Sequence, residues 1–90
     1  MILLINYDLK KPGQDYTALY NAIKGAPSWW HYLESTWIIR TNETPQVWSE
    51  RLRRVMDIND HILVVDITSR PRWGWLPQKA WEWLRENEKL

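Results

Sequence analysis

The sequence predicts an α+β domain in which one sheet with two helices is followed by a tryptophan-rich C-terminal helix. Apolar runs of strand length alternate with stretches whose apolar residues recur at helical spacing. The chain has 90 residues, enough for one small domain, and 44% hydrophobic residues argue against disorder. Eight tryptophans and no phenylalanine supply the apolar area that so short a chain needs for a core.

The first strand is predicted in the run MILLINYD, residues 1–8, which is apolar and ends in polar residues. Side chains alternate between the faces of a strand, so Asn6 and Asp8 share one face. The following KKPGQ stretch predicts a turn, marked by Pro12 and Gly13.

The first helix is predicted from the apolar stripe that follows the turn. It ends before Gly25 and Pro27, both of which interrupt helices. The stripe consists of Tyr16, Leu19, Tyr20 and Ile23.

The stretch WWHYLESTWIIRT, residues 29–41, has the alternation of a strand in its second half. Its first half permits two interpretations: a separate short strand that turns at residues 33–35, or the start of one long strand with a bulge. Trp37 is expected in the core, whereas Trp29 and Trp30 are expected at a sheet edge or interface.

The second helix begins in TNETPQVW, where Thr44 is the predicted N-cap and Pro45 the first helical residue. Its buried stripe is predicted as Trp48, Leu52 and Val55. The last strand is predicted in HILVVDIT.

The tail, residues 69–90, starts irregular and becomes a helix from about Pro77. A ferredoxin-like domain is predicted over residues 1–68, and the tail is predicted as a separate C-terminal extension. Four apolar residues share an arc of about 100° on the helix, with Trp81 at its rim. They are Leu76, Ala80, Trp83 and Leu84.

If residues 29–41 form a hairpin, residues 1–68 have the ferredoxin-like order βαββαβ. The helices would cover one face of the sheet. The first and last strands are nevertheless apolar on both faces, which requires a cover for the second face as well. The tryptophan-rich tail and a second copy of the chain are the two candidates, and a homodimer is expected.

The segment INYDLKKPG ends its strand in Tyr7 and Asp8, and in this it resembles the Cas-two family of small CRISPR-associated adaptation proteins. Residues 1–68 are more closely similar to a bacterial set described as SinR-like, which is grouped with that fold. The resemblance implies a ferredoxin-like domain that dimerises sheet to sheet. It also implies a catalytic, Mg²⁺- or Mn²⁺-binding role for Asp8 near the dimer axis, although many members are structural DNA-binding subunits. The family usually has a pair of basic residues early in the first helix, where this chain has Gln14 and Asp15.

Asn6 is expected beside Asp8 as a second oxygen ligand for the metal, since two copies of Asp8 across a dimer axis suit a divalent cation. The alternative for Asp8 is a role in the turn before the first helix. His31 is either a general base toward an RNA 2′-hydroxyl or a hydrogen-bonded member of an aromatic cluster. His61 is expected as a strand-entry residue.

Basic side chains interleaved with aromatic rings suit phosphates and stacked bases. The segment RPRWGW is the best local example, but its rings also suit a cover for the bare sheet face, in the same chain or in a partner. The alternative for the basic residues is a solvated surface. The candidate nucleic-acid contacts are Lys10, Lys11, Arg51, Arg53, Arg54, Arg70, Arg72, Trp73 and Trp75.

The composition narrows the function classes. Without cysteine there is no disulfide or thiolate metal site, and the formal net charge is only +1. The apolar run at the start is too short for a membrane span, so the chain is expected in the cytoplasm without a membrane partner. We expect a Cas-two-like protein that handles RNA or DNA, with metal-dependent cleavage as one mode. The alternative is a non-catalytic binding or assembly module that uses its aromatic surface for a protein partner or a nucleotide.

Overall fold

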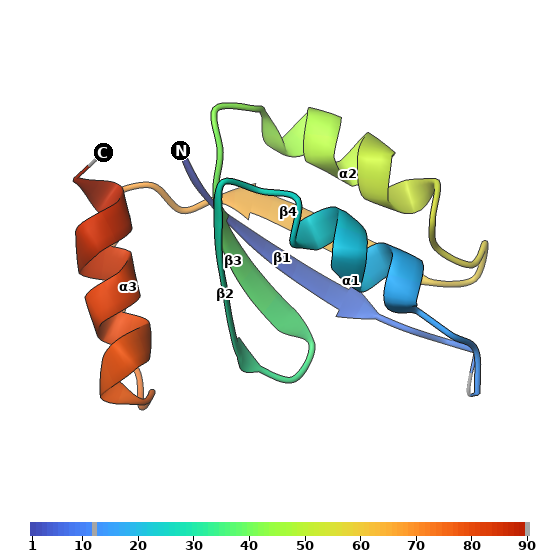
Figure 1. Ribbon diagram of the computed structural model, residues 1–90, viewed down its shortest axis with the longest axis horizontal. Helices are drawn as coiled ribbons and strands as arrows, with labels where there is room; N and C mark the ends of the chain where they lie inside the picture. The colour runs from blue at the N-terminus through green and yellow to red at the C-terminus, as the bar shows by residue number, and fades with distance from the viewer. Residues whose placement is uncertain (12, 90) are drawn as a thin grey trace.

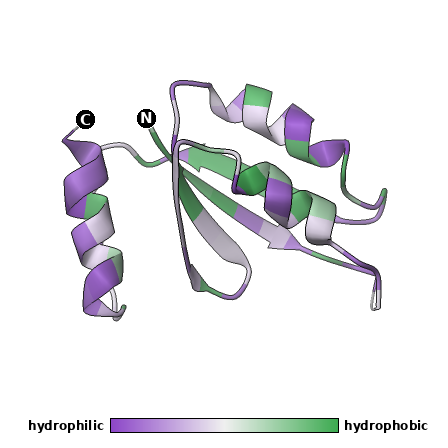
Figure 2. Ribbon diagram, viewed as in Figure 1, coloured by the Kyte–Doolittle hydropathy of each residue, from purple (hydrophilic) through white to green (hydrophobic). Residues whose placement is uncertain are grey.

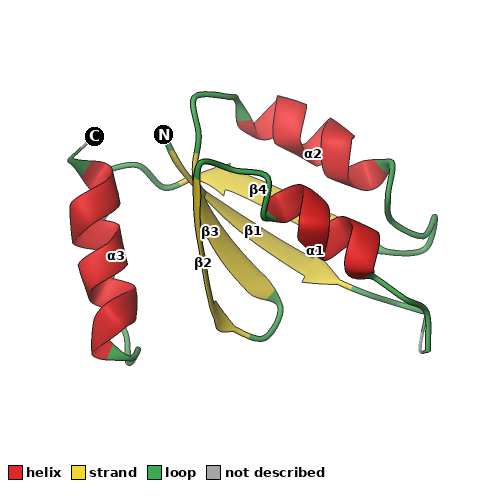
Figure 3. Ribbon diagram, in the orientation of Figure 1, coloured by secondary structure: helices red, strands yellow, loops and turns green. Residues whose placement is uncertain are grey.

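The computed structural model describes residues 1–11 and 13–89, so the predicted turn residue Pro12 lies outside the described part. The chain forms an α+β fold with one antiparallel sheet (Figures 1 and 3). The elements follow one another in the predicted order: β1 (Ile2–Asp8), α1 (Thr17–Ile23), β2 (Ser28–Leu33), β3 (Thr36–Arg40), α2 (Pro45–Arg53), β4 (His61–Asp66) and α3 (Gln78–Glu88).

Residues 28–40 form a hairpin, which decides between the two interpretations of the tryptophan-rich stretch. The strands β2 and β3 are antiparallel, with Trp30 opposite Ile38. The register shifts between Trp30 and Leu33, so the hairpin is irregular near its turn. Strand β2 is an edge strand, as expected for the segment that carries Trp29 and Trp30.

The strand order in the sheet is β2-β3-β1-β4. Every neighbouring pair is antiparallel, so β1 and β2 run parallel with β3 between them. Two β-α-β units, β1-α1-β2 and β3-α2-β4, are thereby interleaved. The register sets Asp8 opposite His61, which brings the end of β1 beside the start of β4.

Helices α1 and α2 lie together on one face of the sheet and enclose the main core (Figure 1). Thr44 caps α2 by accepting a hydrogen bond from the Val47 N–H, and Pro45 is the first helical residue, as predicted. Val55 was expected in the buried stripe and is exposed, because α2 ends at Arg53. The fully enclosed residues of this core include Leu3, Ile5, Leu19, Ile23, Trp37, Ile39, Trp48 and Leu52.

Helix α3 covers part of the opposite face of the sheet. The tryptophan-rich tail, one of the two predicted covers, therefore fills this role in part. Ala80 and Leu84 pack there against Ile2, Trp30 and Ile38. In Figure 2 the hydrophilic colour of α3 gathers on the side turned away from the sheet.

The cover by α3 is incomplete over β4. There Leu63 remains 61% exposed and Val65 38% exposed. Both share the second face with Asn6 and Leu4, their cross-strand partners on β1. The second face of the sheet is therefore half core and half open surface.

Candidate functional site

Asp8 lies at the exposed end of β1, where the sequence analysis placed its catalytic candidate. Its Oδ2 atom is 2.5 Å from the Lys10 Nζ atom. His61 is its direct partner across the β1–β4 pair, on the same face of the sheet. A cation at this carboxylate would have to compete with the Lys10 ammonium.

Asn6 lies two residues before Asp8 on the same face. Its side-chain amide donates to the Ser35 carbonyl at 3.2 Å and to the Thr36 Oγ1 atom at 2.7 Å. These bonds orient the amide and leave its Oδ1 atom as an acceptor. Across residues 1–11 and 13–89, no three acidic or histidine side chains gather closely enough to hold a metal ion. Since Mg²⁺ requires octahedral oxygen coordination, a metal at Asp8 would need a second copy of the chain or bound water.

The buried carboxylate of Asp60 supports this end of the sheet, although no local sequence pattern marks it as a site residue. Asp60 is 4% exposed. It accepts hydrogen bonds from the backbone N–H groups of Lys10 and Asp57 and from the Tyr16 hydroxyl. Burial alone would raise the pKa of Asp60, but these hydrogen bonds outweigh it and lower the pKa. Asp60 thus ties the segment after Asp8 to the loop before β4.

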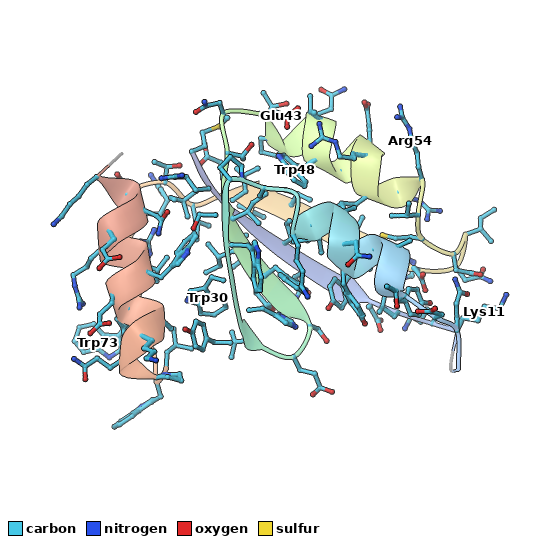
Figure 4. All side chains as sticks on the ribbon, viewed as in Figure 1. Lys11, Trp30, Glu43, Trp48, Arg54 and Trp73 are labelled. Atoms are coloured by element: carbon cyan, nitrogen blue, oxygen red, sulfur yellow. The ribbon has the colours of Figure 1, made fainter. Side chains whose placement is uncertain are left out.

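The basic residues proposed to contact nucleic acid lie at two ends of the molecule. Figure 4 shows Lys11 and Arg54 at one end of the long axis and Trp73 at the other. Lys10 and Arg53 belong to the first group by sequence, and Arg70 and Arg72 to the second. The fold therefore separates Lys11 and Arg54 from the exposed rings, whereas Arg70 and Arg72 line the same groove as Trp73.

Several of these cations are also engaged within the chain. Arg51 forms a two-pronged ion pair with Glu43, at 2.9 and 2.6 Å, which lowers the pKa of Glu43. Its guanidinium also lies 4.6 Å from the centre of the Trp48 ring. Arg53 donates to the carbonyls of Asp57 and Ile58 just beyond α2. These contacts give Arg51 and Arg53 structural roles within the chain.

Trp73 and Trp75 are 99% and 100% exposed. The segment that carries them, residues 70–76, is called the tryptophan loop below. Arg72 anchors it by pairing with Glu88 and donating to the Ile67 carbonyl at 2.6 Å. The interpretation that these rings cover the bare sheet face within the same chain is wrong. Cover by a partner chain stays a prediction.

An apolar groove lies beside the tryptophan loop, on the second face of the sheet. Its volume is about 280 Å³, and it is lined by residues of the sheet, the loop and α3. Leu33, at the end of β2, is 46% exposed on its wall. The groove and the exposed rings are neighbours on one end of the molecule.

His31 belongs to an aromatic cluster on the face of the sheet that α1 and α2 cover. Its ring stacks on Trp37 at 3.8 Å between centres, with 6° between planes. Its Nδ1 atom is 3.1 Å from the Thr36 carbonyl. This agrees with the cluster interpretation of His31, and a role as general base stays a prediction.

Comparison with protein-family models, with curated proteins and with solved structures gives no match. None of the described helices has the length and apolar character needed to cross a membrane.

Proposed function

We propose that this chain is a non-catalytic binding and assembly module of ferredoxin-like fold that works as a homodimer. The observation that carries the proposal is the nearly complete exposure of Trp73 and Trp75 on an anchored loop. Burial of a large apolar side chain contributes roughly 1.5–3 kcal/mol, so two exposed rings on one loop favour association.

The apolar area on this part of the molecule supports a second copy as the partner. Each tryptophan can bury roughly 150–250 Å². Two rings from each of two copies would remove roughly 600–1,000 Å² from water, against about 1,600 Å² in a standard interface. The groove wall at Leu33 and the open strand surface at Leu63 and Val65 supply further apolar area on the same face of the sheet.

The proposed contact is reciprocal: the tryptophan loop of each copy lies in the groove of the other. A two-fold dimer repeats every contact twice, so the loop and the groove can be tested separately. Because the loop carries few free cations, charge favours a protein surface over a phosphate backbone as its partner.

The test measures association by sedimentation equilibrium. We expect a dimer for the wild type and monomers for the double variant Trp73→Ala/Trp75→Ala and for Leu33→Glu. A mixture of the two variants should recover heterodimers, since the loop of one copy can still meet the unaltered Leu33 wall of the other. Trp29→Ala, which removes an exposed ring elsewhere, serves as the control and should dimerise.

Circular dichroism must show that each variant is folded. A wild-type monomer at micromolar to millimolar concentration would overturn the proposal. So would a loop variant that dimerises as well as the wild type.

A second candidate function is metal-dependent cleavage of RNA or DNA at Asp8, as the Cas-two resemblance implies. The specific observation in its favour is the shared exposed face of Asn6, Asp8 and His61. A dimer that packs these faces together would bring two Asp8 carboxylates near one axis.

The expected outcome is cleavage of RNA or DNA by the wild type with Mn²⁺ or Mg²⁺. Asp8→Ala should abolish the cleavage without unfolding, because Asp8 is exposed. Gel analysis of labelled strands measures it, with Glu86→Gln as a surface control. Equal cleavage by wild type and Asp8→Ala, or none by either, would exclude this role.

A further inference from the structure

A pocket of about 370 Å³ lies between α1 and the β2–β3 hairpin, away from the tryptophan loop. Its size is within the range of small-molecule sites, about 300–1,000 Å³. Aromatic rings form most of its wall: Tyr7, Tyr20, Trp29, His31 and Trp37.

The pocket floor is held together by contacts among its own side chains. The Trp37 indole donates to the Tyr7 hydroxyl at 3.1 Å. Burial raises the pKa of Tyr7, which keeps that hydroxyl protonated. Trp29 and Tyr20 flank Trp37, with ring centres 5.4 and 6.2 Å from it.

His31 extends this floor into a stack that remains open on one side. One face of the His31 ring covers Trp37. The residue is exposed, so a further planar ring can add to the other face. The Thr36 carbonyl can only accept a hydrogen bond, so the Nδ1–H group of His31 is the donor in this contact.

Lys24 and Glu34, two residues of opposite charge, both line the pocket. Lys24, just after α1, holds its ammonium 5.3 Å from the centre of the Trp29 ring. Glu34 lines the pocket at the hairpin turn. A ligand that complements these groups has an anionic group for Lys24, a planar ring for the stack, and hydrogen-bond donors for Glu34.

We propose that this pocket binds a nucleotide whose base carries an amino group. The base stacks on His31, the phosphate pairs with Lys24, and the amino group donates to Glu34. This site is separate from the proposed dimer contact and does not depend on it.

The test follows the amide and indole N–H signals by NMR while a ligand is added. The ligands are cytidine monophosphate, uridine monophosphate, cytidine and inorganic phosphate. We expect saturable binding of cytidine monophosphate, with shifts at Trp29 and His31. Uridine monophosphate should bind more weakly because it lacks the amino group, and cytidine more weakly because it lacks the phosphate.

The variants separate stacking from charge. His31→Ala should weaken binding of cytidine monophosphate about 5- to 150-fold, the range that one stacked base provides, and His31→Phe should retain most of the affinity. Lys24→Glu should weaken binding of the nucleotide but not binding of cytidine. Trp73→Ala/Trp75→Ala should bind normally, which distinguishes this site from the tryptophan loop.

A cytidine trinucleotide distinguishes two sources of the ligand. Tighter binding than the mononucleotide would assign the pocket to single-stranded nucleic acid, and equal binding would assign it to free nucleotide; both support the site. The proposal is overturned if cytidine monophosphate gives no saturable shifts at millimolar concentration. It is also overturned if His31→Ala and Lys24→Glu both bind it like the wild type.

Discussion

Each fully buried tryptophan has a partner for its indole N–H group. Trp30 donates to the Ala80 carbonyl, Trp37 to the Tyr7 hydroxyl and Trp48 to the Thr41 hydroxyl. An unpaired buried donor would cost about 1–3 kcal/mol, so these hydrogen bonds allow the rings to serve as core. Trp73 and Trp75 face water and need no such partner.

Asp60 gives the first stability prediction. Asp60→Asn should lower the free energy of unfolding by roughly 1–3 kcal/mol at neutral pH, because the amide replaces an ionised acceptor of several hydrogen bonds. The pKa of Asp60 is lower folded than unfolded. Its contribution is therefore present at neutral pH and is lost as the pH falls below about 3.9.

Urea unfolding at a series of pH values measures this contribution. The difference in the free energy of unfolding between wild type and Asp60→Asn should shrink as the pH falls from about 6 to about 3. This range includes the ordinary Asp pKa of about 3.9. Glu86→Gln, an exposed change on α3, is the control and should follow the wild type. A constant difference over this range would contradict the assignment.

At the level of elements, α3 is held by a small number of contacts on one side. Trp30 is central among them, being 1% exposed and bonded to the Ala80 carbonyl. A second bond joins the Trp83 indole to the Ser28 hydroxyl at 2.9 Å. Both contacts join the edge strand β2 to α3, so the position of the helix depends on that strand.

Trp30→Ala should therefore destabilise the domain by about 3–5 kcal/mol and release α3 before the remaining fold. Protease cleavage in residues 69–89 under native conditions measures the release. Trp30→Phe keeps the ring and should have a smaller effect. Trp29→Ala is the matched control, since Trp29 is 41% exposed on the other face of the same strand. Equal protease resistance of Trp30→Ala and wild type would contradict this account.

The whole molecule presents different surfaces at different places. The tryptophan loop and its groove are at one end, while Lys11 and Arg54 are at the other (Figure 4). The aromatic pocket is on the helix-covered face, and the open half of the sheet is on the opposite face. This separation permits a dimer contact and a ligand site in one small domain, because neither surface uses the other's side chains.

The order of the elements was predictable from local patterns. Strand alternation, helical spacing and turn residues each depend on neighbours within a few positions. Thr44 followed by Pro45 is such a signal, and the stripe of Leu76, Ala80, Trp83 and Leu84 is another. Exposure of Asp8 could also be expected, because it ends a strand beside a turn. The local patterns nevertheless left the hairpin and the bulged strand equally open, since Glu34 and Ser35 are not strong turn markers.

Contacts between distant segments decided the remaining features. The approach of Asp8 to His61 follows from the register of β1 with β4, and the three hydrogen bonds of Asp60 join parts of the chain far apart in sequence. The aromatic pocket likewise requires α1 to lie over the hairpin. Local sequence determined which segments become strands and helices, because backbone preferences act over short distances. Tertiary packing decided which tryptophans are buried and which face water, because burial depends on what the rest of the chain places against each ring.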